Sequence, residues 1–312
     1  MQPGTDATAS LVVVLKRTSV QSEVLVCRPM KYQLEDGGQR DMFAWPGKRL
    51  ALLTPRRDLD AKVMTRIVDA LDRADAFAET LTGRKPRDNP RRTFEGRTTI
   101  AVMPNFSAAF GIGGLELEED VFQLLYEGTR DAGQFNQLVF FYLGYCYWFY
   151  GDQLEHKAPD ENPNVVCAYA VFLRFLLMEA AGVQGGPFHD QPFERFRSEV
   201  EGLLDLYQAD RTLTWDNTLR MDKAPANPMN LSGSDLFASF LFRLRKDYGG
   251  DEFLKRLWQE VAKRPRAQTA QEAVDNFVIA SSLAAKRNLT DLFLKQWRWP
   301  VSDQAREFLK RL

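Results

Sequence analysis

Short runs of alternating hydrophobic and polar residues fill the first third of the chain. The segments "SLVVVLKR" and "SEVLVCRPMKYQL" alternate and are rich in Val, so they predict two strands that can pair as a hairpin. "RLALLT" and "RTTIAVMP" predict two more short strands, and "AAFGIGGLELEED" predicts an exposed strand that leads into a turn. This part of the chain is therefore expected to form a small sheet.

One long amphipathic helix interrupts these strands. In "DLDAKVMTRIVDALDRADAFAETLTG" the apolar residues recur every three or four positions, as one face of a helix requires. Asp58 or Asp60 can cap its start, and Gly83 can end it in a left-handed conformation. The spacing predicts a helix that backs the sheet.

From Asp120 onward the apolar periodicity is almost entirely helical. No fixed-length repeat occurs, so a solenoid is not expected. The fold class is therefore α+β: a small N-terminal mixed sheet with a long backing helix, followed by a mainly helical C-terminal half, with a cleft between them. The seam is placed in the proline-bounded loop "HKAPDENPN", which divides the chain into residues 1–157 and 158–312.

Composition and charge limit the classes of partner that the protein is expected to bind. The net charge is −1 and the pI about 6.2, which favours neither a nucleic acid nor an anionic membrane surface. The three cysteines lack close pairing, so no disulfide framework or cysteine metal knuckle is expected. The longest apolar run, residues 139–150, is too short to span a bilayer. No signal peptide is visible, and a secreted natural protein would have had its signal trimmed from this chain.

The stretch "QLVFFYLGYCYWFYGDQLEH", from Gln137 to His156, is the most unusual in the sequence. It predicts a helix over residues 135–150 with a small Gly in a bulky run and a polar exit. The order of elements around it resembles the zincin metallopeptidases, specifically the gluzincin-like kind. The resemblance rests on the edge-strand-like "GIGGLELEE", the helix "FNQLVFFYLGYCYW" and the late "AVDNFVIASSLAAKRNLTDLFLKQWRWPVS", whose end is similar to secreted bacterial and viral members.

The resemblance implies an active-site helix that has lost its metal ligands. In that family two His one turn apart hold Zn²⁺ and an intervening Glu activates the bound water. When the family's H-E-x-x-H motif is aligned with "FYLGY", Phe141 and Tyr145 take the ligand positions and Tyr142 takes that of the general base. The family's third ligand is a Glu on the next helix, for which Glu179 is the best match. We expect no bound metal and no cofactor.

Carboxylates near the expected cleft leave a hydrolase open as an alternative. Two carboxylates about 5–10 Å apart can hydrolyse a glycosidic bond. Glu127, Asp152 and Glu155 are the candidates, with Tyr142 or Tyr145 as further acid–base groups.

The aromatic density of the 135–150 helix supports two interpretations. A helix that is apolar all round is usually buried in a core. In the zincin-like frame the rings instead line the cleft floor, where they suit a peptide, a glycan or a small apolar ligand. Two function classes follow: a non-catalytic binding or accessory module, which we favour, and a hydrolase of glycoside or peptide bonds. The expected ligand-binding residues are Phe141, Tyr142, Tyr145, Glu116, Glu179 and His156.

Overall fold

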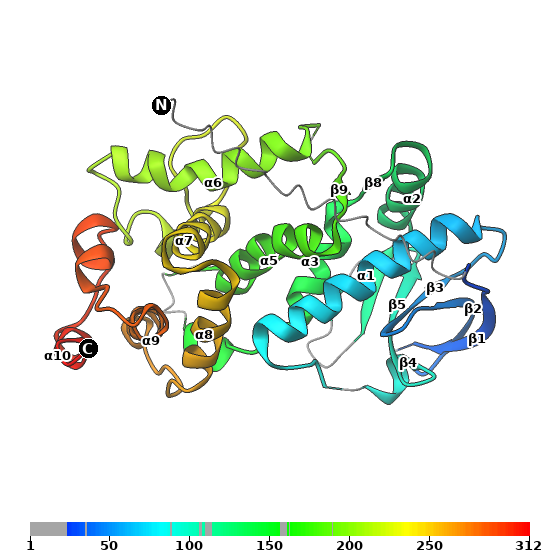
Figure 1. The fold of residues 1–312 in the computed structure, drawn as a ribbon, viewed down its shortest axis with the longest axis horizontal. Coiled ribbons are helices and arrows are strands. Elements are labelled where there is room, and N and C mark those ends of the chain that lie inside the picture. Colours follow the sequence, from blue (N-terminus) through cyan, green and yellow to red (C-terminus); the bar gives the residue numbers. More distant parts are fainter. Residues whose placement is uncertain are drawn as a thin grey trace, which may run out of the picture.

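A seven-stranded curled sheet packs beside a larger group of helices (Figure 1). The computed structural model describes residues 24–34, 36–87, 89–105, 108–109, 114–156, 161, 163–188 and 190–312. The chain is therefore α+β, as its sequence predicts.

The sheet is mixed, with strand order β1-β2-β3-β5-β7-β6. Strands β3, β5 and β7 run parallel to one another, whereas β1, β2 and the edge strand β6 are antiparallel to their neighbours. The small strand β4 pairs with the start of β5. The strands are β1 (Arg28–Gln33), β2 (Gln39–Pro46), β3 (Leu50–Thr54), β4 (Thr93–Phe94), β5 (Arg97–Met103), β6 (Ala108–Ala109) and β7 (Leu115–Glu118).

Two of the expected strands are confirmed in full, as β3 and β5. "SLVVVLKR" lies outside the described residues, and "SEVLVCRPMKYQL" forms a strand only from Arg28. The sequence did not predict β2, because both of its faces are partly covered and no clean alternation marks it. The prediction of an exposed strand in "AAFGIGGLELEED" is wrong for residues 115–117, which are buried in β7 between β5 and β6. The edge strand is β6, and residues 110–113 lie outside the described residues.

The backing helix forms as its capping residues predict. Helix α1 (Ala61–Thr82) begins after Asp60, whose side chain accepts from the backbone N–H groups of Lys62 and Val63. It ends at Gly83, which has φ 67°. Its buried face covers one side of the sheet and contacts the helical half, so α1 joins the two parts of the molecule.

A buried helix, α5, lies near the centre of the molecule and packs against α1, α3 and α7 (Figure 1). The helices after α1 follow in chain order. They are α2 (Glu119–Glu127), α3 (Gln137–Cys146), α4 (Gly151–Leu154), α5 (Val165–Ala181), α6 (Phe193–Ala209), α7 (Gly233–Tyr248), α8 (Gly250–Ala262), α9 (Ala270–Ala285) and α10 (Asp303–Leu309). Single π-helical segments span Gly128–Ala132 and Leu292–Gln296, and β8 (Gln134–Phe135) pairs with β9 (Gln184–Gly185). Within the described residues no helix is both long and apolar enough to cross a membrane.

The helix predicted over residues 135–150 is shorter than expected. Helix α3 ends at Cys146, and Tyr147 caps it with backbone N–H bonds to the carbonyls of Gly144 and Tyr145. Tyr147 is buried because its hydroxyl donates to Asp75 on α1, at 2.7 Å from Oδ1. The aromatic residues after Cys146 therefore contact different parts of the molecule and do not continue the helix.

One apolar core extends from the sheet into the helical half. It includes Leu52 and Val102 on the sheet, Phe172 on α5 and Trp299 near the C-terminus. A smaller apolar cluster covers the other face of the sheet. The division into residues 1–157 and 158–312 stays a prediction.

Gly144 brings α3 and α5 close together. A Cβ built at Gly144 would lie 3.4 Å from the Ala170 Cα and 3.5 Å from the Leu173 Cβ, so it would be in tight but ordinary contact. We expect Gly144→Ala to change the free energy of unfolding by less than about 1 kcal/mol, since helix propensity offsets the tighter fit. We expect Gly144→Leu to lower it by about 2–3 kcal/mol through overpacking. Urea unfolding of both variants checks this, and equal effects would contradict it.

Candidate functional site

Three aromatic side chains form what we call the ring face of α3: Phe141, Tyr142 and Tyr145. Each is half-buried, neither in the core nor fully exposed. The Phe141 ring meets the Tyr142 ring edge-on at 5.6 Å between centroids and the Tyr145 ring at 5.1 Å. Helix α3 contacts the edge strand β6 and its neighbour β7. The ring face therefore lies on a helix held against the edge of the sheet.

A polar chain runs from the ring face into the helices behind it. Cys167 lies close enough to Tyr145, and to Ser234 at the start of α7, for the side chains to influence one another electrostatically. The Ser234 hydroxyl and backbone N–H both reach Asp222 Oδ1, at 3.1 and 2.8 Å. Burial raises the pKa of Cys167 and of Tyr145. Neither group is therefore poised as an anionic nucleophile or base near neutral pH.

Arg174 is a buried cation surrounded by aromatic rings. Its side chain is on α5 and the residue is 2% exposed. The guanidinium carbon lies 4.7 Å from the ring centroids of Phe175 and Phe196, 5.0 Å from that of Phe188 and 5.7 Å from that of Phe141. Burial lowers the pKa of Arg174 to about 10, so the group stays charged at neutral pH.

Sequence reasoning missed both Cys167 and Arg174 as site residues. They stand seven positions apart in "CAYAVFLR", which puts them on the same face of α5, opposite Tyr145 and Phe141 respectively. Two polar residues at this spacing in an otherwise apolar helix were the available signal.

Glu179 does not reach the ring face. It lies twelve residues after Cys167 and five after Arg174, about 18 Å and about 8 Å farther along the axis of α5. Its carboxylate is 3.0 Å from Arg245 and 3.3 Å from Arg197, and Arg245 is the stronger cause that keeps its pKa low. The structure thus places Glu179 in a surface ion-pair cluster instead of near Phe141 and Tyr145.

Glu116 has a structural position on the opposite face of the sheet. One carboxylate oxygen accepts from Arg92 at 2.6 Å and from the Tyr32 hydroxyl at 2.8 Å. All three side chains are buried. Because Leu115 and Leu117 face the helices, the pleat turns Glu116 away from the ring face.

The three proposed catalytic carboxylates do not converge. Glu127 ends α2, which packs on the sheet, and accepts from Gln123 at 2.6 Å. Asp152 is exposed on α4, which packs against α9, and lies 3.6 Å from Arg266. Glu155, the next residue after α4, is half-buried and acts electrostatically on Tyr145. Glu127 therefore lies on a helix that packs on the sheet, whereas Asp152 and Glu155 belong to a segment that packs against α9.

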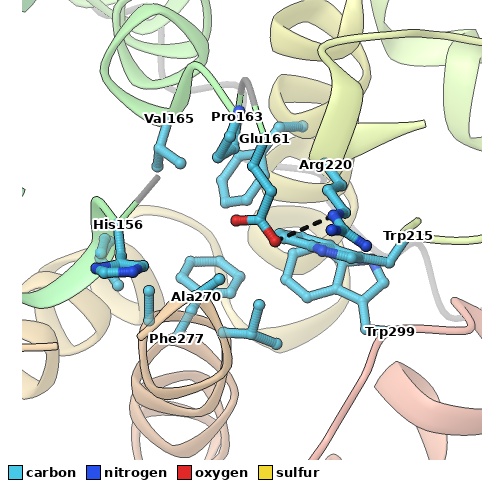
Figure 2. Close-up of a pocket in the computed structure, with 13 residues that line it drawn as sticks. His156, Glu161, Pro163, Val165, Trp215, Arg220, Ala270, Phe277 and Trp299 are labelled. Carbon is cyan, nitrogen blue, oxygen red and sulfur yellow. Dashed lines mark ion pairs between the residues drawn. The ribbon is translucent and has the colours of Figure 1, made fainter. Parts of the chain in front are cut away.

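A narrow pocket opens at the N-terminal end of α5 (Figure 2). Its cavity volume is about 20 Å³. Its walls are mostly apolar: Leu154, Pro163, Val165, Trp215, Phe237, Ala270, Ala273, Val274, Phe277 and Trp299. The slot therefore holds about one water as it stands, and a larger group enters only if its walls move apart.

Charged and polar groups line one side of this pocket. His156 faces the slot from the end of α4, and Glu161 lies across from it (Figure 2). A Glu161 oxygen is 3.0 Å from Arg220 Nε. His156 is the expected ligand-binding residue that the structure places in a pocket, whereas the other histidine, His189, lies outside the described residues. Trp215 and Trp299 line the pocket and also belong to the core.

Metal-ligating residues do not gather anywhere in the described part of the chain: it contains no group of three or more His, Cys, Asp or Glu side chains able to hold an ion. Near the ring face, Cys167 and Glu155 are the described side chains of these types that act electrostatically on Tyr145.

Comparison with known proteins identifies the fold without a function. No family model matches the chain, and no curated protein matches it. Two crystal structures of a functionally unknown conserved protein from Bacillus anthracis str. Ames, one of them a mutant, are similar to it at 11% sequence identity. Their TM-scores are 0.56 and 0.55 for the protein and its mutant, and each match covers 86% of this chain. The chain spans about half of these proteins, 51% of their length.

Proposed function

We propose that the protein is a non-catalytic binding module built on a zincin-like, gluzincin-like scaffold. The observation that carries this proposal is the ring face of α3. In the alignment with such a scaffold that we propose, its two metal ligands and general base are replaced by three half-buried rings. These rings lie on a helix that contacts an antiparallel edge strand. Side chains in that state present an apolar surface with two hydroxyl groups, which suits a peptide or a glycan.

The hydrolase alternative gains no specific support. A two-carboxylate reaction needs its carboxyl groups about 5–10 Å apart, and Glu127 ends α2 on the sheet, whereas Glu155 follows α4, which packs against α9. Asp152 on α4 is exposed and lies 3.6 Å from Arg266. A tyrosine acid–base group would need a carboxylate hydrogen-bonded to it, and within the described residues Tyr145 has no such bond. We therefore keep binding of a peptide or a glycan as the primary hypothesis, and test the peptide first.

A binding experiment with matched aromatic variants tests this proposal. Immobilised protein is exposed to a random hexapeptide library, and retained peptides are quantified by mass spectrometry. We expect Phe141→Ala to reduce retention at least about 10-fold, as loss of a buried aromatic contact predicts. Phe308→Ala is the control, because Phe308 is an exposed ring on α10. Equal retention by both variants would place binding elsewhere.

Metal analysis tests the other half of the proposal. We expect purified protein to contain clearly less than one zinc per chain, and EDTA to leave its melting temperature unchanged. One zinc per chain, lost together with thermal stability, would show that the scaffold still depends on a metal.

A further inference from the structure

Arg174 carries a positive charge that the surrounding residues leave without a direct counter-ion. Within the described part of the chain, its Nε has no hydrogen-bond acceptor and no acidic side chain forms an ion pair with it. Asp235 is the acidic group that faces it, but Asp235 Oδ2 already accepts from the backbone N–H of Ser232 in the cap of α7. The rings around the guanidinium give cation–π stabilisation, which is small beside the cost of burying a charge.

The guanidinium lies only one layer of side chains below the surface. Of the four rings around it, Phe175 and Phe196 are buried, whereas Phe141 and Phe188 are half-buried and reach the surface. Phe141 is itself part of the ring face. A ligand that displaces or slides past the Phe141 ring would therefore meet an arginine fork in a dry, apolar setting.

We infer that Arg174 is an anion-binding subsite beneath the ring face of α3, and that the ligand it takes carries a carboxylate group. The planar guanidinium matches a carboxylate with two parallel hydrogen bonds, and such a bond is strong where water is excluded. The inference deepens the proposed peptide-binding role and rests on it. A peptide supplies this group at its C-terminus or in an Asp or Glu side chain.

Three hexapeptide libraries distinguish these sources: one with free C-termini, one amidated, and one amidated that also lacks Asp and Glu. We expect the wild-type protein to retain carboxylate-bearing peptides at least about 10-fold better than the third library. Arg174→Met should reduce this preference to about 2-fold or less, and Arg174→Lys should keep part of it. Arg197→Met is the matched control, because Arg197 is a nearby arginine that is already paired with Glu201 at 2.8 Å.

Thermal unfolding shows whether Arg174→Met has removed a ligand site or a structural contact. We expect its melting temperature to equal or exceed that of the wild type, since removing an uncompensated buried charge is neutral or stabilising. A fall of more than about 5 °C would mean that Arg174 is a structural cation and would overturn the inference. Equal retention of all three libraries by the wild type would also overturn it while leaving peptide binding intact, and retention of none would overturn both.

Discussion

The double substitution Phe141→His and Tyr145→His is expected to create a zinc site with a dissociation constant of about 1 μM or below, equivalent to about 8 kcal/mol of binding free energy. The two rings are already 5.1 Å apart on successive turns of α3, the spacing at which two histidines hold one ion. Cys167 lies near the present Tyr145 side chain and is the candidate for a third ligand. Competition with a chromophoric chelator measures the affinity.

Two further substitutions make this zinc experiment specific. Adding Cys167→Ser should weaken zinc binding at least about 10-fold, because it replaces a thiolate ligand. Adding Arg174→Met should strengthen it, because a like charge near the ion is removed. If the double variant takes up no zinc, positions 141 and 145 do not converge with Cys167, and the zincin-like placement of α3 loses its main support.

Glu116→Gln is expected to lower the free energy of unfolding by about 3–5 kcal/mol. The sequence alone does not distinguish Glu116 from the exposed acids near it. The substitution removes the carboxylate that pairs with buried Arg92 and accepts from Tyr32. Breaking such a pair is costly because the remaining guanidinium loses its counter-charge in a place that water does not reach.

The matched control for Glu116 is Glu119→Gln. Glu119 is exposed in the first turn of α2, so its loss should cost less than about 1 kcal/mol. Urea unfolding of both variants separates the two roles. A cost below about 1 kcal/mol for Glu116→Gln would show that the ion pair contributes no net stability, and peptide retention by the folded variant should be unchanged.

The sequence predicts the fold class and the bounds of α1 well because local chemistry determines them. Asp60 and Gly83 mark the ends of α1, and the apolar spacing between them leaves one face for the sheet. Strand β2 could not be predicted in the same way. Its pattern depends on contacts with both faces of the sheet, which only the folded chain supplies.

The candidate site was predictable only in part, for a related reason. The unusual helix with Phe141, Tyr142 and Tyr145 is recognisable from the sequence alone. The half-buried state of these three side chains agrees with a role in lining a ligand site. The proximity of Cys167 and Arg174 to the ring face becomes evident only once α5 is packed against α3, since neither residue belongs to a short sequence motif. Glu116 and Glu179, by contrast, read as unpaired acids in the sequence. Their ion-pair partners lie 24 and 66 positions away along the chain.

The apolar core shared by the sheet and the helices has a mechanical consequence. Helices α1 and α5 are packed on both sides. A hinge motion that separated the sheet from the helical half would therefore expose that core. Entry of a ligand to the ring face of α3 must then proceed by local rotation of side chains such as Phe141. Local rotation of this kind is far faster than hinge motion between domains, so a ligand should meet a receptor that is rigid in its backbone and adaptable only at its surface.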